Sequence, residues 1–105
     1  MLSKENQERK NKFVQQYSNI LEFYPNVWLC EGNSYTMLHA DYILRVAFDD
    51  FSSNAPRYFW WVSSWNGTRH VLHYSDFVPA GHATLEEAQR TVINVYRQRI
   101  LREAI

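Results

Sequence analysis

The stretch YFWWVSSWNGTRHVLHY, residues 58–74, decides the fold, because Asn66-Gly67 separates two runs rich in aromatic and β-branched residues. An Asn-Gly pair in that setting is a strong signal for a β-hairpin with a two-residue type I′ turn. Such a turn also fixes which residues of the two strands lie opposite each other. Counting outward from the turn predicts four pairs on one face: Trp65 with Thr68, Ser63 with His70, Trp61 with Leu72, and Phe59 with Tyr74.

The opposite face of this hairpin carries Tyr58, Trp60 and Val62. Both faces are therefore aromatic, whereas an antiparallel sheet with one wet side alternates apolar and polar residues. Either the rest of the chain covers both faces, or one face binds a partner. The same alternation puts His70 and His73 on opposite faces, which argues against a metal ion bound by both.

The flanking segments predict one helix before the strands and one after them. Apolar residues between positions 3 and 24 form one helical stripe, and the polar residues 1–12 are a helix start that can fray. Pro25 ends this helix, because the residue before a proline is disfavoured in the helical conformation. The second helix begins at the capping box Thr84-Leu85-Glu86-Glu87. Its buried stripe is predicted to be Leu85, Ala88, Val92, Val95, Tyr96, Ile100 and Ala104.

Four strands are predicted between the helices. Residues 27–31 form a short strand, and the hairpin supplies two more. Residues 35–49 are predicted as one long strand, or two collinear strands bent near Ala40-Asp41, with even positions from Thr36 to Phe48 on the core face. The order predicts an α+β domain in which both helices cover one face of a four-stranded antiparallel sheet. The second aromatic face of the hairpin then stays open.

Length and composition limit the domain count and the type of partner. The 105 residues predict a single domain, because no linker or repeat divides residues 1–105. Lys and Arg number 11, as do Asp and Glu, which argues against general binding of duplex DNA. Cys30 has no second cysteine to pair with, and the N-terminus lacks the apolar core of a signal peptide. We therefore expect a cytoplasmic protein that does not span a membrane.

The aromatic hairpin face is the candidate binding surface. We expect it to recognise another protein or a second copy of the chain, as in a dimer, because Trp, Tyr and Arg supply most of the energy at protein interfaces. The predicted partner-binding residues are Phe59, Trp61, Trp65, Arg69, His70 and Tyr74. Tyr58 and Trp60 on the opposite face are the alternative set, and a further interpretation is that both faces are core. The second hypothesis is a module for single-stranded nucleic acid that uses the same rings with Arg57 and Arg69.

Catalytic and metal-binding patterns are weak. Cys30 lies in a predicted strand without a nucleophile signature, although His39 or His73 would be a candidate base. His73, Asp76 and His82 converge only if the loop after the hairpin folds back. We therefore expect no catalytic residue, no metal ion and no cofactor, and an enzyme that uses His73, Asp76 or Cys30 is the third hypothesis.

The segment WVSSWNGTRHVLHYSDF, residues 61–77, followed by GHATLEEAQRTVINVY, residues 81–96, resembles the end of many short bacterial and phage proteins. The shared features are a W-x-x-x-W-x-G hairpin and a helix that opens with T-x-E-E-A. The resemblance covers under half of the chain and includes no site motif. It implies a small accessory protein, of the type that mobile elements encode, that binds and blocks another protein.

Overall fold

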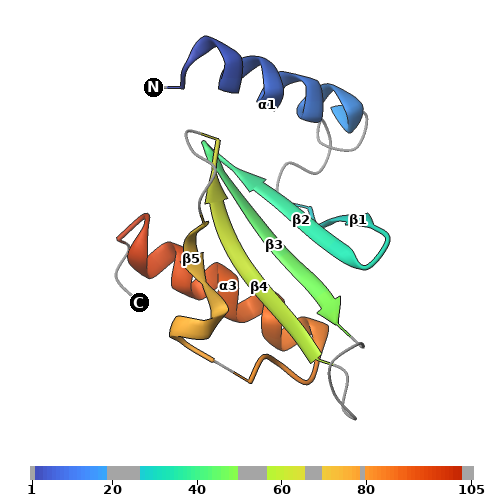
Figure 1. The fold of residues 1–105 in the computed structure, drawn as a ribbon, viewed down its shortest axis with the longest axis vertical. Helices are drawn as coiled ribbons and strands as arrows, with labels where there is room; N and C mark the ends of the chain where they lie inside the picture. The colour runs from blue at the N-terminus through green and yellow to red at the C-terminus, as the bar shows by residue number, and fades with distance from the viewer. Residues whose placement is uncertain (1, 19–26, 50–56, 66–69, 79, 103–105) are drawn as a thin grey trace.

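The computed structural model describes residues 2–18, 27–49, 57–65, 70–78 and 80–102. They form an α+β fold, in which one antiparallel sheet carries a helix from each end of the chain (Figure 1). The elements are α1 (Lys4–Gln16), β1 (Leu29–Glu31), β2 (Ser34–His39), β3 (Tyr42–Asp49), β4 (Arg57–Ser64), β5 (His70–His73), the 3-10 turn η1 (Tyr74–Asp76) and α3 (Leu85–Arg99). The strands lie in the order β1-β2-β3-β4-β5. The predicted α+β class is confirmed, with five strands in place of four.

The additional strand comes from a tight hairpin between β2 and β3. His39 lies opposite Tyr42, which leaves Ala40 and Asp41 as a two-residue turn. Ala40 takes a positive φ of 51°, and the Asp41 carbonyl oxygen accepts a 2.9 Å hydrogen bond from the backbone N–H of Trp65. The prediction of one long strand, or of two collinear strands, is therefore wrong, because the chain reverses direction at Ala40.

This turn also changes which residues of β2 face the core. Met37 lies opposite Leu44, and Tyr35 lies opposite Val46, so the odd positions of β2 share a face with the even positions of β3. Thr36 and Leu38 therefore lie on the other face, against the prediction that all even positions share the core face. The prediction holds for β3, where Leu44 and Val46 are almost completely buried.

β4 and β5 form the predicted hairpin, whose turn residues 66–69 lie outside the described residues. Ser63 lies opposite His70, as predicted. The register then shifts, so that Val62 pairs with Leu72 and Trp61 with His73. The predicted pair of Trp61 with Leu72 is wrong, because a β-bulge adds one residue to β5. Residues of β5 after the bulge change faces as a result.

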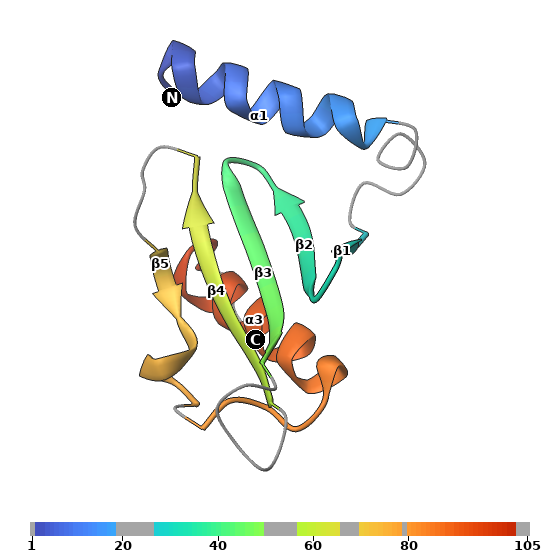
Figure 2. The same cartoon turned by 45° about the vertical axis from the view of Figure 1, so that its right-hand side comes forward.

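α3 packs on one face of the sheet and forms the core with it (Figure 2). Its buried residues Ala88, Val92, Val95 and Tyr96 contact the central strands, which contribute Leu44, Val46, Trp60 and Val62. Thr84 caps the helix as predicted, since its Oγ1 accepts a 3.2 Å hydrogen bond from the backbone N–H of Glu87.

α1 crosses the end of the sheet near the β2–β3 turn (Figures 1 and 2). This corrects the prediction that both helices share one face. Lys10 holds the helix there, because its Nζ donates a 2.7 Å hydrogen bond to the Ala40 carbonyl oxygen and lies 3.2 Å from Asp41 Oδ1. Only Phe13 and Val14 of α1 are large and apolar, which is too little apolar surface to cover a sheet face.

α1 has a capped start at Ser3 and ends at Gln16. The Ser3 hydroxyl accepts a 3.2 Å hydrogen bond from the backbone N–H of Asn6, so the polar residues from Lys4 onward are helical. The predicted extension to Tyr24 falls largely on residues 19–26, outside the described residues.

None of the helices in the described ranges is both long and apolar enough to cross a membrane.

Candidate binding site

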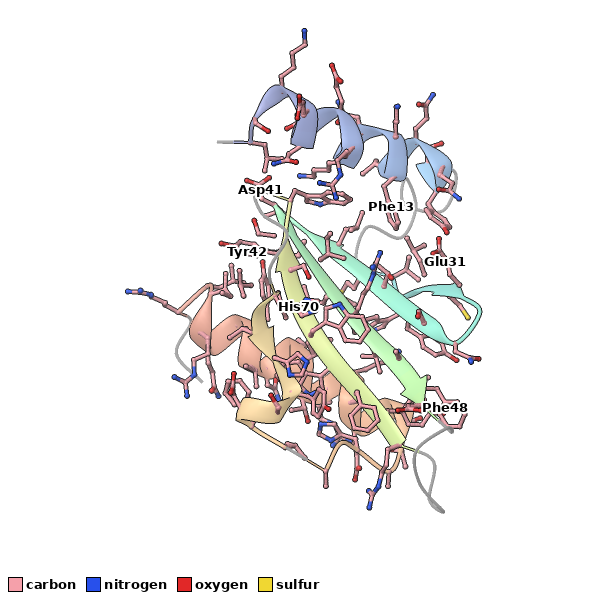
Figure 3. The ribbon with its side chains drawn as sticks, viewed as in Figure 1. Phe13, Glu31, Asp41, Tyr42, Phe48 and His70 are labelled. Carbon is pink, nitrogen blue, oxygen red and sulfur yellow. The ribbon has the colours of Figure 1, made fainter. Side chains whose placement is uncertain are left out.

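Five ring side chains lie in continuous contact along β4, β5 and η1. We call this set the aromatic strip, and it consists of Phe59, Trp61, His70, His73 and Tyr74. Ring centroids lie 5.6 Å apart between Trp61 and His70, 5.8 Å between His70 and His73, 4.5 Å between His73 and Tyr74, and 4.7 Å between Tyr74 and Phe59. His70 is exposed and the other four are half-buried. Figure 3 shows His70 on the side of the sheet away from α3.

The β-bulge in β5 makes the strip continuous. Because of the bulge, His73 pairs with Trp61 and lies on the same face as His70. The prediction that His70 and His73 point to opposite faces is therefore wrong. Leu72, which was predicted opposite Trp61, instead packs against the core. The exposed face thus carries a histidine at the position where regular alternation would place a leucine.

Trp65 lies next to the strip and is buried beneath α1. It is 6% exposed, and its ring centroid lies 6.0 Å from that of Phe13. The guanidinium carbon of Arg9 lies 5.7 Å from the centroid of the Trp65 ring, within the range of a cation–π interaction. Figure 3 shows Phe13 directed from α1 toward the end of the sheet. Trp65 therefore joins α1 to the sheet.

A pocket of about 330 Å³ opens between α1 and the end of the aromatic strip. Its lining consists of Arg9, Ile43, Arg45, Trp61, Ser63, Ser64, Trp65 and His70. Arg45 Nε donates a 3.3 Å hydrogen bond to Thr36 Oγ1, and Arg9 Nη1 donates a 3.2 Å hydrogen bond to Asn6 Oδ1. The pocket thus combines two cationic side chains with aromatic and hydroxyl groups, and it contains no lining carboxylate among the described residues.

The structure brings together four of the six predicted partner-binding residues: Phe59, Trp61, His70 and Tyr74. Trp65 is adjacent but buried, and Arg69 lies outside the described residues. The alternative set faces α3, where Trp60 is completely buried and so unavailable to a partner.

Sequence reasoning missed His73, Arg9 and Arg45 as members of this site. His73 depends on the bulge, which no glycine in β5 signals. Arg45 follows from strand alternation once β3 is placed, since it lies opposite Trp61. Arg9 lies in a polar helix whose position depends on tertiary contacts. The sequence around Arg9 therefore does not predict which part of the sheet it lies against.

A larger hollow of about 430 Å³ lies on the α3 side, lined by Met37, His39, Leu44, Ile93, Tyr96, Arg97 and Leu101. Its polar groups already have partners within the protein. His39 Nδ1 and the Tyr96 hydroxyl lie 2.7 Å apart in a hydrogen bond, and Arg97 also makes an interaction. The pocket at the aromatic strip is lined by a buried tryptophan, Trp65, whose indole N–H has no hydrogen-bond acceptor among the described residues, and it is the stronger candidate site.

Cys30 and His73, a candidate nucleophile and one of its candidate bases, are not brought together. Cys30 lies on β1 and His73 on β5, at opposite edges of the sheet. Four strand spacings of about 4.8 Å separate these edges, so the two side chains do not form a nucleophile–base pair. His73 Nδ1 lies 2.8 Å from the Ser75 hydroxyl. Across the described ranges, no group of three His, Cys, Asp or Glu residues is arranged to hold a metal ion.

His82 has a structural role in the core. It is 7% exposed, and its Nε2 accepts a 3.1 Å hydrogen bond from the indole Nε1–H of Trp60. Two backbone hydrogen bonds of 2.8 Å also join His82 to Tyr58. Burial lowers the pKa of His82 below its ordinary value of 6.5; the Glu87 carboxylate opposes this shift, and Arg57 adds to it.

Stability should therefore fall as the pH drops below about 6.5. Between that pH and the lower pKa of the folded state, the unfolded chain binds a proton at His82 and the folded protein does not, so the free energy of unfolding decreases by at most about 1.4 kcal/mol per pH unit and levels off below the folded-state pKa. Urea unfolding between about pH 8 and pH 5 measures the slope. The variant His82→Gln, whose amide oxygen can still accept from Trp60, should lose this component. Equal slopes in the two proteins would contradict the assignment.

No protein-family model matches the chain, and no curated protein or solved structure shows significant similarity to it. Its function is therefore inferred from its own geometry.

Proposed function

We propose that this protein is a small non-enzymatic binding module that acts in the cytoplasm by recognising another protein, or a second copy of itself, through the aromatic strip. The observation that supports this most directly is the exposed and half-buried run of Phe59, Trp61, His70, His73 and Tyr74 on the side away from α3. Aromatic side chains flanked by arginines are the usual anchors of protein interfaces. An accessory or inhibitory role is part of this proposal, following the resemblance of residues 61–96.

Trp61 is the best-placed anchor of the strip. It is half-buried, lies between Arg45 and His73 in the sheet, and is absent from the side chains packed on the α3 core. Its ring can therefore be covered by a partner without disturbing the fold. Phe59 shares these properties, whereas Tyr74 also packs against the core.

The variant Trp61→Ala is expected to keep its circular dichroism spectrum and to bind a partner at least about 30-fold more weakly, as a hot-spot loss of about 2 kcal/mol implies. Nuclease-treated host lysate passed over tagged protein, followed by mass spectrometry, identifies the partner, and titration with the purified partner measures affinity. Sedimentation velocity measures self-association in the same variants.

Leu101→Ala is the matched control, because Leu101 is 36% exposed and follows the end of α3, where it lines the hollow on the α3 side and not the strip. It should bind as the unsubstituted protein does. Loss of folding in Trp61→Ala would mean that the strip is core, and equal binding by all three proteins would reject the aromatic strip as an interface.

A single-stranded nucleic-acid-binding module is the second candidate function. The observation that favours it is the presence of Arg9 and Arg45 in the pocket beside Trp61, since base stacking combines with nearby cationic groups in such modules. Under this alternative, nuclease treatment of the lysate abolishes the capture of any partner by the tagged protein. The affinity for an oligonucleotide also falls as the salt concentration rises.

A further inference from the structure

We propose that the pocket between α1 and the aromatic strip binds a carboxylate, and that the partner supplies it as an Asp or Glu side chain next to an apolar residue that packs on Trp61. This inference rests on the proposed function and specifies the chemistry of the partner. The pocket has room for one such group, with a volume of about 330 Å³.

The two pocket arginines provide the charge. Their hydrogen bonds run to neutral oxygens, Arg45 to Thr36 Oγ1 and Arg9 to Asn6 Oδ1. Asp41, the carboxylate near this end of the sheet, pairs with Lys10, and the described lining of the pocket places no carboxylate beside either arginine. Guanidinium groups bind carboxylates through paired N–H donors, so a single acidic group can satisfy both arginines.

The indole N–H of Trp65 is an independent indication of a ligand. Trp65 lines the pocket and is 6% exposed, yet its Nε1 has no hydrogen-bond acceptor among the described residues. A buried donor without an acceptor is unfavourable and uncommon in folded proteins. Because this nitrogen has almost no accessible surface, a carboxylate oxygen in the pocket becomes its acceptor only if the Trp65 ring turns toward the pocket when the partner binds. By contrast, the buried indole N–H of Trp60 is satisfied by His82.

The distribution of charge favours one carboxylate of a protein over the phosphates of a nucleic acid. Arg9 and Arg45 line one pocket at one end of the strip, whereas a single strand needs cationic groups that follow successive phosphates. Toward the other end Arg57 lies opposite Asp49, a residue that already makes an interaction. The net charge of the chain is also +0, so no general attraction for a polyanion adds to the local charge.

The experiment follows the indole N–H signals of the full ¹⁵N-labelled chain, which contains 4 tryptophans. The probes are the dipeptide amide Ac-Trp-Glu-NH₂ and its uncharged analogue Ac-Trp-Gln-NH₂, with inorganic phosphate and a dT₁₀ oligonucleotide as further arms. The Trp65 signal is assigned with Trp65→Phe. We expect a saturable shift of this signal with the Glu probe and an affinity about tenfold weaker for the Gln probe, which corresponds to one charge-assisted contact.

Substitutions separate the pocket from the rest of the strip. Arg45→Gln and Arg9→Gln should each lower the affinity for the Glu probe about tenfold. Arg45→Lys should lower this affinity less, because it keeps the charge. Arg57→Gln is the matched control, since Arg57 lies on the same face at the distant end, and it should leave binding unchanged. Thermal unfolding verifies that each variant is folded; if Arg45→Gln is not, Arg9→Gln on the surface of α1 provides the test.

Three results with the probes would overturn the inference. The first is equal binding of the Glu and Gln probes, and the second is a Trp65 signal that stays fixed at saturation with the Glu probe. The third is a salt-dependent response to dT₁₀ that is stronger than the response to the Glu probe, which would assign the pocket to nucleic acid. If Trp61→Ala abolishes capture of a protein partner while Arg9→Gln and Arg45→Gln do not affect it, the proposed function stands and the carboxylate site is rejected.

Discussion

Replacing Trp60 with alanine is expected to lower the free energy of unfolding by about 3–5 kcal/mol, the range for truncating a buried aromatic residue. Trp60 is 0% exposed at the centre of the core, where its ring lies 5.6 Å from that of Phe77. Truncation opens a cavity against α3 and also leaves His82 Nε2 without its donor. For a domain of this size the midpoint of thermal unfolding should fall by roughly 15–30 °C.

Trp61→Ala is the matched control for this effect, because Trp61 is the next residue on the same strand and faces the other side of the sheet. Its free energy of unfolding should fall by only about 1 kcal/mol. Trp60→Phe separates packing from hydrogen bonding, since it keeps a ring and removes the N–H, with an expected loss of about 1–3 kcal/mol. Urea unfolding of the three variants gives the comparison, and similar losses for the two alanine variants would contradict the assignment of the faces.

Local signals in the sequence were sufficient for much of the fold. The cap at Thr84, the buried residues Ala88, Val92, Val95 and Tyr96 of α3, and the pairing of β4 with β5 each depend on residues close together in the chain, and these predictions are confirmed. The register of the hairpin beyond Ser63 is not, and the predicted stripe residue Ala104 lies outside the described residues. The turn at Ala40-Asp41 was missed because it contains neither Gly nor Asn. Ala40 has a positive φ, and Asp41 in the same turn accepts a backbone hydrogen bond from Trp65, which lies 24 positions further along the chain.

The candidate site was less predictable than the fold, because its geometry depends on one irregularity and one long-range contact. Strand alternation alone predicts that aromatic residues gather on one face of the hairpin. The bulge places His73, and not Leu72, opposite Trp61. No residue nearby in the sequence signals this bulge, because the register is set by what the two faces of the strand contact. The pocket further requires α1 to cross the end of the sheet, where Phe13 and Lys10 fix its position.

Gly81→Ala is expected to lower the free energy of unfolding by about 3 kcal/mol, for two additive reasons. Gly81 has a φ of +75°, a conformation that costs other residues about 1–2 kcal/mol. A Cβ at this position would also lie 2.6 Å from Phe59 Cε1 and 3.0 Å from the Tyr58 carbonyl oxygen. The ring of Phe59 or the backbone must move to relieve the clash, at a further cost of about 1–3 kcal/mol.

Gly32→Ala isolates the first of these contributions, the backbone conformation. Gly32 has a similar φ of +59°, but a Cβ there meets nothing within 4 Å. Its loss should therefore be limited to the backbone term of about 1–2 kcal/mol. The difference between the two variants in urea unfolding measures how tightly the segment before α3 packs against Phe59, and thus how firmly this end of the aromatic strip is held. Equal losses would show that Phe59 moves aside freely, and that the strip is not preorganised at this end.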